Sequence, residues 1–309
     1  MKNNELHSKN LGFSFILSSR IQKILIKYFL KLFRAHLNGG REQIAVFAFD
    51  LIALEVNLRG MYEKEELEVF FEWAMKTGLT KKFKKTTAID IGANVGNHSL
   101  FFSKFFKHVI SYEPNESVFN LLKLNSALKK NIKIYNLGLS NFNGFVNFDI
   151  NNFNLGNSKI KKTKTLKNLD RQVKVCKLDS HIKQLKDISL IKIDVEGHEF
   201  EALSGASQVI STNRPVILFE QHKKEFSVLD KFLNKSTPTI ELLKSLNYKK
   251  FAVIEYFPQQ QEEVRKWYKP RILRLFSKIA LMFRYSPTIK IVTKEYLAPK
   301  KYPLIIALP

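Results

Sequence analysis

Two glycines in the first third of the chain are spaced so that they could bind a cofactor. The sequence from Thr87 to Ser99 begins as a short apolar run, passes through Gly92 and Gly96, and continues as a helical pattern. A strand that enters a helix through such a turn begins a doubly wound α/β domain, where ligands bind outside the carboxyl ends of the strands. Glycine lets the backbone approach a ligand closely or adopt a positive φ.

Two acidic residues give this region its chemical character. The pattern from Asp90 is Asp-x-Gly-x-Asn-x-Gly, not the Gly-x-Gly-x-x-Gly that places a pyrophosphate at a helix N-terminus. A carboxylate here suits S-adenosylmethionine, which carries ammonium and sulfonium groups and no phosphate. Glu113 ends the next strand and is placed to accept hydrogen bonds from both ribose hydroxyls. The candidate cofactor-binding residues are Asp90, Gly92, Ala93, Asn94, Gly96, Asn97, Glu113 and Pro114.

A second group of reactive side chains follows the fourth predicted strand. Asp194, Glu196 and His198 lie at its carboxyl end, where a base could remove a proton from a hydroxyl. Glu220 and His222 follow the fifth strand and are further candidates. Asp194 could instead bind loop amides, and His198 could be a solvent-facing helix residue. Acids with histidine also bind hard metals, but this spacing is generic, and no metal is expected.

The hydrophobic pattern predicts the elements that position these residues. Besides the strands before Gly92, Pro114 and Asp194, strands are predicted at Lys133–Leu139, Phe145–Ile150, Gln172–Leu178, Pro215–Glu220 and Tyr248–Glu255, with an antiparallel return at Leu304–Leu308. Helices are predicted at Glu65–Lys76, after the capping residue Asn115, and at Ile240–Leu246. The apolar stretch Ile44–Leu54 could be strand or helix. The lysine-rich loop Asn151–Arg171 is long enough to indicate a function, such as covering the cofactor or touching the acceptor.

The order of these motifs resembles the FkbM family of S-adenosylmethionine-dependent methyltransferases. The residues that carry the resemblance are Ile89–Gly96, Tyr112-Glu113-Pro114, Leu178-Asp179, Ile191–Glu199, Arg214-Pro215 and Phe219-Glu220, within about Gly60 to Glu255. The run Lys-Ile-Asp-Val-Glu-Gly-x-Glu is specific, although His198 stands where the family often has a small residue. The resemblance implies a class I methyltransferase fold, with a Rossmann-like doubly wound sheet of seven strands. It also implies O-methylation of hydroxyls on sugars, glycans or secondary metabolites, without identifying the acceptor.

The net charge of +23 is concentrated in three basic stretches. Residues 1–41 contain eight Lys and Arg, residues 159–174 contain seven and residues 265–301 contain eleven, each against one acidic residue. Such stretches attract nucleic acid, anionic lipid or acidic glycans, although a solvated lysine-rich surface is the alternative. The single cysteine, Cys176, excludes an intrachain disulfide and fits a reducing compartment, so we expect a cytoplasmic protein.

Two of the basic stretches have a helical hydrophobic period. Ile21, Ile24, Leu25, Tyr28, Phe29, Leu32 and Phe33 form one apolar face, and a similar face recurs between Pro270 and Tyr285. Basic residues interrupt each window long enough to span a membrane. We expect these helices either to lie on an anionic membrane surface, at the inner membrane face, or to pack on the domain or a second copy.

The sequence thus divides into three regions. Residues 1–85 form an N-terminal helical extension, 86–257 a methyltransferase core, and 258–309 a basic C-terminal segment with a final strand. The predicted function is an O-methyltransferase that uses S-adenosyl-L-methionine on a hydroxyl-bearing small molecule or glycan. A nucleic-acid methyltransferase would explain the charge, but no Asn-Pro-Pro-Tyr motif or nucleic-acid module is present. A nicotinamide oxidoreductase is disfavoured by Asp90 and the missing third glycine. The oligomeric state remains open.

Overall fold

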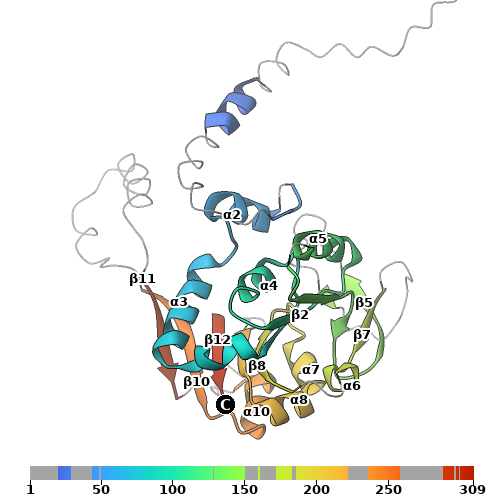
Figure 1. Ribbon diagram of the computed structural model, residues 1–309, viewed down its shortest axis with the longest axis vertical. Helices are drawn as coiled ribbons and strands as arrows, with labels where there is room; N and C mark the ends of the chain where they lie inside the picture. The colour runs from blue at the N-terminus through green and yellow to red at the C-terminus, as the bar shows by residue number, and fades with distance from the viewer. Residues whose placement is uncertain are drawn as a thin grey trace, which may run out of the picture.

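The computed structural model describes residues 20–28, 44–48, 50–127, 129–149, 159–160, 172–182, 186–221, 236–257, 288–295, 297–298 and 300–309. Its centre is an eight-stranded sheet between two helical layers (Figure 1). No helix in this part of the chain is long and apolar enough to cross a membrane.

The large sheet has the strand order β11-β10-β12-β9-β8-β1-β2-β3. These strands are β1 (Thr87–Ile91), β2 (His108–Tyr112), β3 (Ile132–Tyr135), β8 (Ile188–Ile193), β9 (Val216–Gln221), β10 (Lys250–Phe257), β11 (Thr288–Lys294) and β12 (Tyr302–Leu308). The five strands from β3 to β9 are parallel neighbours. β12 lies antiparallel between β9 and β10, which confirms the predicted return of the C-terminal strand.

The arrangement is the doubly wound, Rossmann-like fold that the sequence predicts. β11 adds one strand to the seven expected, and it pairs antiparallel with β10 at the sheet edge. Its residues fall in the region where the sequence indicates only a basic segment before the final strand. The pattern Thr-Ile-Lys-Ile-Val-Thr-Lys alternates as an edge strand with one apolar face.

Two hydrophobic cores lie on opposite faces of the sheet because side chains alternate along each strand. Ile89 packs in one core with the helices α6 (Leu178–His181), α7 (Glu199–Ser204), α8 (Ser207–Asn213) and α10 (Pro238–Ser245). Its neighbour Ala88 packs in the other with α3 (Lys64–Lys76), η1 (Leu79–Lys85) and α4 (Asn97–Phe102). This second core is rich in phenylalanine, and the ring of Phe71 lies 4.3 Å from Phe105 and 5.1 Å from Phe101, centroid to centroid.

A smaller sheet stands beside β3. It contains β4 (Gly138–Leu139), β5 (Gly144–Asp149), β6 (Lys159–Ile160) and β7 (Gln172–Cys176). The antiparallel pairing of β5 with β7 confirms the predicted strand pair. The single predicted strand Lys133–Leu139 was wrong, because Asn136 breaks it into β3 and β4 by donating to the carbonyls of Glu113 and Pro114. Apart from β6, the predicted loop Asn151–Arg171 lies outside the described residues.

The N-terminal region contributes helices. The helix α2 (Leu51–Arg59) begins at Asp50, whose side chain accepts the N–H of Ile52, and ends at Gly60 with φ +81°. The second part of the Ile44–Leu54 stretch is therefore helical. After Pro114, Asn115 caps α5 (Glu116–Ser126) as predicted. Residues 20–28 are helical, but the rest of the predicted N-terminal amphipathic helix and the Pro270–Tyr285 helix lie outside the described residues.

Candidate active site

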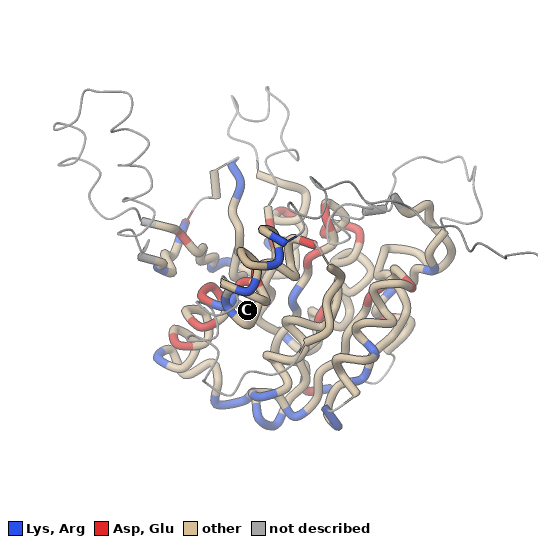
Figure 2. The backbone as a smooth tube through the Cα atoms, turned by 90° about the horizontal axis from the view of Figure 1, so that it is seen from above, with Lys and Arg blue, Asp and Glu red and all other residues tan. Residues whose placement is uncertain are grey.

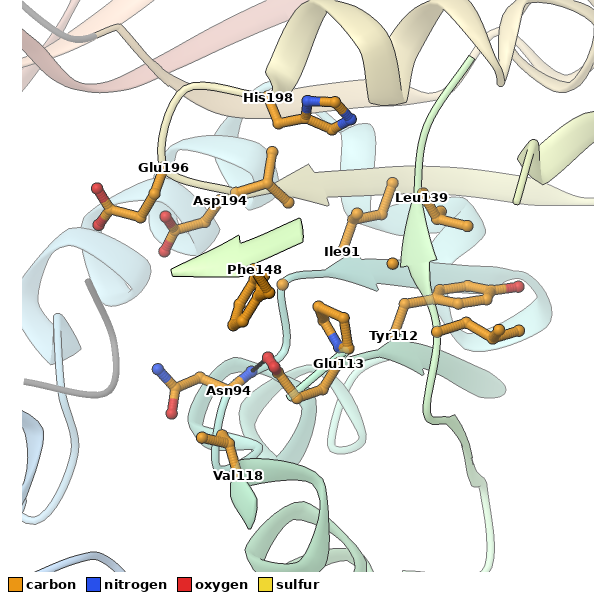
Figure 3. A pocket seen from close by; sticks show the side chains of 15 residues that line it. Ile91, Asn94, Tyr112, Glu113, Val118, Leu139, Phe148, Asp194, Glu196 and His198 are labelled. Carbon is orange, nitrogen blue, oxygen red and sulfur yellow. Dashed lines mark hydrogen bonds between the residues drawn. The ribbon is translucent and has the colours of Figure 1, made fainter. Parts of the chain in front are cut away.

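A cavity opens at the carboxyl ends of β1, β2 and β8, the edge where doubly wound folds bind ligands (Figure 3). It encloses about 630 Å³ including its open mouth. Seven of the predicted site residues line it, namely Gly92, Asn94, Glu113, Pro114, Asp194, Glu196 and His198. The structure therefore brings the two predicted groups to one place, although about a hundred residues separate them in sequence.

Gly92 allows two strand ends to meet. Its φ is +76°, and a Cβ atom at this position would lie 1.8 Å from the carbonyl oxygen of Asp194. The N–H of Asp194 donates to the carbonyl of Ile91 at 3.0 Å, so the ends of β1 and β8 are already in close contact. The N–H groups of Gly92 and Ala93 both donate to the carbonyl of Tyr112, at 3.0 and 2.9 Å. A larger residue at position 92 would push these strands apart.

Glu113 is fixed against the glycine turn. Its carboxylate accepts the backbone N–H of Asn94 at 3.0 Å and that of Asn115 at 2.8 Å. Burial raises the pKa of Glu113 to about 7, although the two N–H donors and Lys192 oppose the shift. Asn94 itself has φ +51°, so the turn aims its N–H at the carboxylate. The result is a rigid acceptor that points along the cavity wall (Figure 3).

Asp90 takes a different position from the one its motif predicts. It is fully buried and does not line the cavity. Side chains alternate along β1, so Asp90 shares the face of Ala88, towards α4. There it accepts a hydrogen bond from Ser99 Oγ at 2.6 Å. Asp90 therefore lies beneath the turn and outside the cavity lining, and its contact with a cationic cofactor stays a prediction.

Asn97, Ala93 and Gly96 also hold the turn rather than line the cavity. Asn97 exchanges two hydrogen bonds with the backbone of Tyr62, which donates to Oδ1 at 3.0 Å and accepts from Nδ2 at 2.8 Å. Gly96 has φ +93°, and a Cβ there would lie 2.8 Å from Leu122 Cδ1 on α5. These residues support the turn and are absent from the cavity lining, so their predicted part in cofactor binding stays a prediction.

Lys192 joins the two halves of the site, and the sequence reasoning missed it. Its Nζ lies 3.3 Å from Asp194 Oδ2 and 3.7 Å from Asp90 Oδ1. Burial lowers the pKa of Lys192, but Asp194 and Asp90 outweigh that effect, so its pKa is raised overall and the ammonium stays charged. The available signal was a lysine between two isoleucines inside an otherwise apolar strand.

His198 is buried at the start of α7 and lines the cavity, so the solvent-facing alternative is wrong. Its Nε2 lies 3.0 Å from Ser140 Oγ, and its Nδ1 lies 3.5 Å from Glu201 Oε2. Both ring nitrogens therefore have a polar neighbour that orients the ring. The preceding Glu196 has φ +52° and also lines the cavity.

Glu220, near the end of β9, is another acidic residue close to Asp194. Burial, reinforced by the charges of Asp194 and Glu63, raises the pKa of Glu220 to about 8. His222 lies outside the described residues. Within the described ranges, no group of three or more His, Cys, Asp and Glu side chains is arranged to hold a metal ion.

Comparison with known proteins gives one strong match. The model of the methyltransferase FkbM domain matches residues 90–250, more than half of the chain, and this region contains the whole lining of the cavity. No curated protein matches the sequence.

The matches to solved structures are weaker. The methyltransferase FkbM from Methylobacillus flagellatus KT is 20% identical with a TM-score of 0.32, over 44% of this chain and only 32% of that protein. Precorrin-6y C5,15-methyltransferase from Geobacter metallireducens GS-15 is 12% identical with a TM-score of 0.36, over 75% and 85% of the two chains. A Streptococcus mutans protein in complex with SAH is 11% identical with a TM-score of 0.36, over 81% and 99%. Each of these TM-scores is below 0.5, so none of these structures indicates what this chain does.

Proposed function

The chain belongs to the FkbM family of methyltransferases, and from this premise we propose that it methylates a hydroxyl of a sugar, a glycan precursor or a secondary metabolite. The observation that carries this proposal is the position of Glu113. It is held by two backbone N–H groups at the wall of a cavity whose other acidic residues include Asp194. A fixed carboxylate beside a glycine turn suits the ribose of S-adenosyl-L-methionine.

The acidic residues of the cavity suit the positive charge of this cofactor. Glu113 has two carboxylate oxygens that could accept both ribose hydroxyls, while Asp194 and Glu196 offer negative charge to the ammonium and sulfonium groups. When bound, S-adenosyl-L-methionine supplies an electrophilic methyl group on a positively charged sulfur.

The protein's own contribution is to position the acceptor and remove its proton. Holding the reacting oxygen in line and away from water is worth up to roughly 7–11 kcal/mol in ideal intramolecular cases. A base that takes the hydroxyl proton adds about 10²–10⁴-fold. We propose Asp194 for this role, because its carboxylate lines the cavity and Lys192 orients it. Glu196, His198 and Glu220 are the alternatives.

The basic stretches support a further part of the proposal, that the enzyme binds an anionic membrane surface. The helix at residues 20–28 presents exposed apolar side chains and carries Arg20, Lys23 and Lys27. Figure 2 shows several basic positions along the lower rim of the molecule. Such a surface would bring lipid-linked glycan precursors within reach.

The deciding experiment uses the purified protein, S-adenosyl-L-methionine with a labelled methyl group, and a cell extract as the source of acceptors. Mass spectrometry of the product should show a methyl ether on a hydroxyl. A parallel reaction with nuclease-treated extract tests the nucleic-acid alternative, which the net charge of +23 favours. Loss of the labelled product after nuclease treatment would refute the proposed acceptor class.

A further inference from the structure

The segments that enter the strands of the large sheet are rich in lysine. β1, β2, β3, β8 and β9 are parallel, and β10 runs in the same direction because β12 lies antiparallel between it and β9. These strands therefore begin at one edge of the sheet, which we call the strand-start edge. The segments before them are residues 77–86, 103–107, 129–131, 186–187, 214–215 and 246–249.

Positive charge dominates the strand-start edge. Asp187 is the single acidic residue in these segments. Their lysines are Lys81, Lys82, Lys84, Lys85, Lys104, Lys107, Lys129, Lys130, Lys186 and Lys249, and all of them except the half-buried Lys129 are exposed. Clustered charge of one sign on an exposed surface attracts a partner of the opposite sign.

Hydrogen bonds join the segments into one continuous surface. Lys107 N–H donates to the carbonyl of Thr86 at 3.0 Å, which ties the start of β2 to that of β1. The side chain of Asn131 donates to the carbonyls of Ser103 and Phe106, which ties the start of β3 to the segment before β2. The remaining neighbours are joined by the pairs Thr87 with Asp187, Ile188 with Asn213, and Arg214 with Asn247. The lysines are thus carried by a fixed platform that extends from β3 to β10.

The carboxyl ends of the same strands have a different character. There the described residues include Glu113 after β2, Asp194 after β8 and Glu220 near the end of β9. These acids belong to the cavity or lie close to it. Among the described strand ends, an anionic partner would therefore meet the strand-start edge rather than the rim of the cavity.

The side chains of the strand-start edge suit lipid better than nucleic acid. Nucleic-acid sites combine basic groups with exposed aromatic rings on which bases stack. In these segments Phe83, Phe106 and Tyr248 are buried and Phe105 is half-buried. Arg214 donates to the backbone of Asn247 instead of presenting its guanidinium to a phosphate. Met75 in the last turn of α3 and Leu124 near the end of α5 are instead 55% and 62% exposed beside the lysines, as in surfaces that bind anionic membranes.

We propose that the strand-start edge is the face by which the catalytic domain contacts an anionic lipid surface. This contact depends on the proposed membrane binding and extends it from the helix at residues 20–28 to the domain itself. Stable binding takes two contributions, and this edge supplies electrostatic attraction beside the apolar side chains of that helix. The cavity lies at the opposite ends of the strands, so it would face away from the lipid. The acceptor would then be an outer group of a lipid-linked glycan rather than the sugar next to the lipid.

The test removes charge from three strand starts in the full-length protein. The edge variant Lys84→Gln/Lys107→Gln/Lys130→Gln changes one exposed lysine before each of β1, β2 and β3. Its affinity for phosphatidylcholine vesicles that contain phosphatidylserine is measured by cosedimentation at low salt, where screening is weak. Losing three lysines near such a surface should weaken binding about a hundredfold.

A matched control carries the same change in net charge at exposed lysines outside these segments. It is Lys174→Gln/Lys177→Gln/Lys301→Gln, which should bind the same vesicles within about threefold of the wild type. Both variants should keep the melting temperature and the S-adenosylhomocysteine affinity of the wild type, since exposed substitutions rarely disturb a fold. A labelled DNA duplex and an RNA strand, followed by fluorescence anisotropy, test the other class of anionic partner.

The outcomes separate this contact from the membrane binding on which it depends. Equal vesicle binding by the edge variant and the control would mean that the lysines only solvate the surface, which overturns the proposed contact while membrane binding stands. Loss of duplex or RNA binding in the edge variant, with vesicle binding intact, would identify nucleic acid as the partner and also overturn it. If the wild-type protein binds no phosphatidylserine vesicles, the proposed membrane binding and this contact are both refuted.

Discussion

Lys192 lies between Asp90 and Asp194, with its Nζ 3.7 Å from one carboxylate and 3.3 Å from the other. Asp90 and Lys192 lie on the adjacent parallel strands β1 and β8, whose register places them directly opposite each other, and Asp194 follows the end of β8. The ammonium therefore links the acid beneath the glycine turn to the acid that lines the cavity. Because Asp90 and Lys192 are buried, this link is a part of the structure that tolerates little change.

Replacing Lys192 by Met tests that link. The variant leaves Asp90 buried without its positive neighbour, so we expect a loss of about 3–5 kcal/mol in the free energy of unfolding, measured in urea. The double variant Lys192→Met/Asp90→Asn should recover part of that loss. Lys244→Met is the control, because Lys244 forms an exposed pair with Glu241 and should cost less than about 1 kcal/mol. Equal losses in the two single variants would contradict the buried-link interpretation.

Glu113→Ala should weaken the binding of S-adenosylhomocysteine. Losing hydrogen bonds to a charged group costs about 1.5–3 kcal/mol, which calorimetry would record as an affinity at least tenfold lower. The exposed Glu116, in the first turn of α5, provides the control Glu116→Gln, which should bind normally. Unchanged affinity in Glu113→Ala would remove Glu113 from the cofactor site.

The affinity should also depend on pH through Glu113. Burial raises the pKa of Glu113 to about 7, so the empty site is increasingly protonated below that pH. Because hydroxyl donors prefer the ionised carboxylate, S-adenosylhomocysteine should bind more weakly as the pH falls from 8 to 6. Calorimetry at these pH values should show the trend in the wild type and its absence in Glu113→Gln. A trend that persists in the variant would point to another group.

Gly92→Ala should destabilise the fold through a steric clash as well as through backbone strain. The new Cβ would lie 1.8 Å from the carbonyl oxygen of Asp194, and the φ of +76° costs an L-residue roughly 1–2 kcal/mol in addition. Gly197→Ala separates the two effects, because φ there is +96° but no atom lies within 4 Å of the added Cβ. Urea unfolding should show a clearly larger loss for Gly92→Ala. Similar losses would mean that the close approach of β1 and β8 is not required.

Asp194→Asn should lower the rate of methyl transfer by about 10²–10⁴-fold if Asp194 is the base. The amide keeps the size of the side chain and Asp90 still pairs with Lys192, so the loss of stability should be smaller than in Lys192→Met. The competing base is Glu220, whose pKa of about 8 predicts a rate that rises with pH through that value and a profile abolished by Glu220→Gln. Full activity in Asp194→Asn together with such a profile would transfer the role to Glu220.

The parts of this site that the sequence predicts are those encoded locally. The turn at Gly92 and the acid Glu113 follow from short patterns, because a tight turn and a strand end each need particular residues. The orientation of Asp90 depends on which face of β1 meets α4, and its partner Lys192 lies about a hundred residues away. The position of the chain just before α3 depends on hydrogen bonds between Asn97 and Tyr62. Such long-range packing leaves no periodic signal in one sequence.

The proposed membrane contact can be tested by liposome flotation. In the helix at residues 20–28, Ile21, Ile24 and Leu25 have exposed fractions of 49%, 65% and 49%. Each nearby basic residue adds about 1 kcal/mol at an anionic surface, and salt screens that attraction over a Debye length of about 10 Å at 0.1 M. The protein should therefore float with vesicles that contain phosphatidylserine at low salt and be released at high salt. Neutral vesicles serve as the control for apolar adsorption.

Deleting the two predicted basic helices should abolish flotation, because apolar insertion and electrostatic attraction are both needed for stable binding. The variant lacking residues 1–38 and 265–285 retains all of the strands that form the cavity. It should therefore still bind S-adenosylhomocysteine in calorimetry, which shows that the remaining domain is folded. Flotation that is unchanged by the deletion, or no flotation of the intact protein with phosphatidylserine vesicles at low salt, would refute the membrane proposal. In that case the apolar face of the helix at residues 20–28 would have to be covered by another part of the chain or by a second copy, which sedimentation velocity would distinguish.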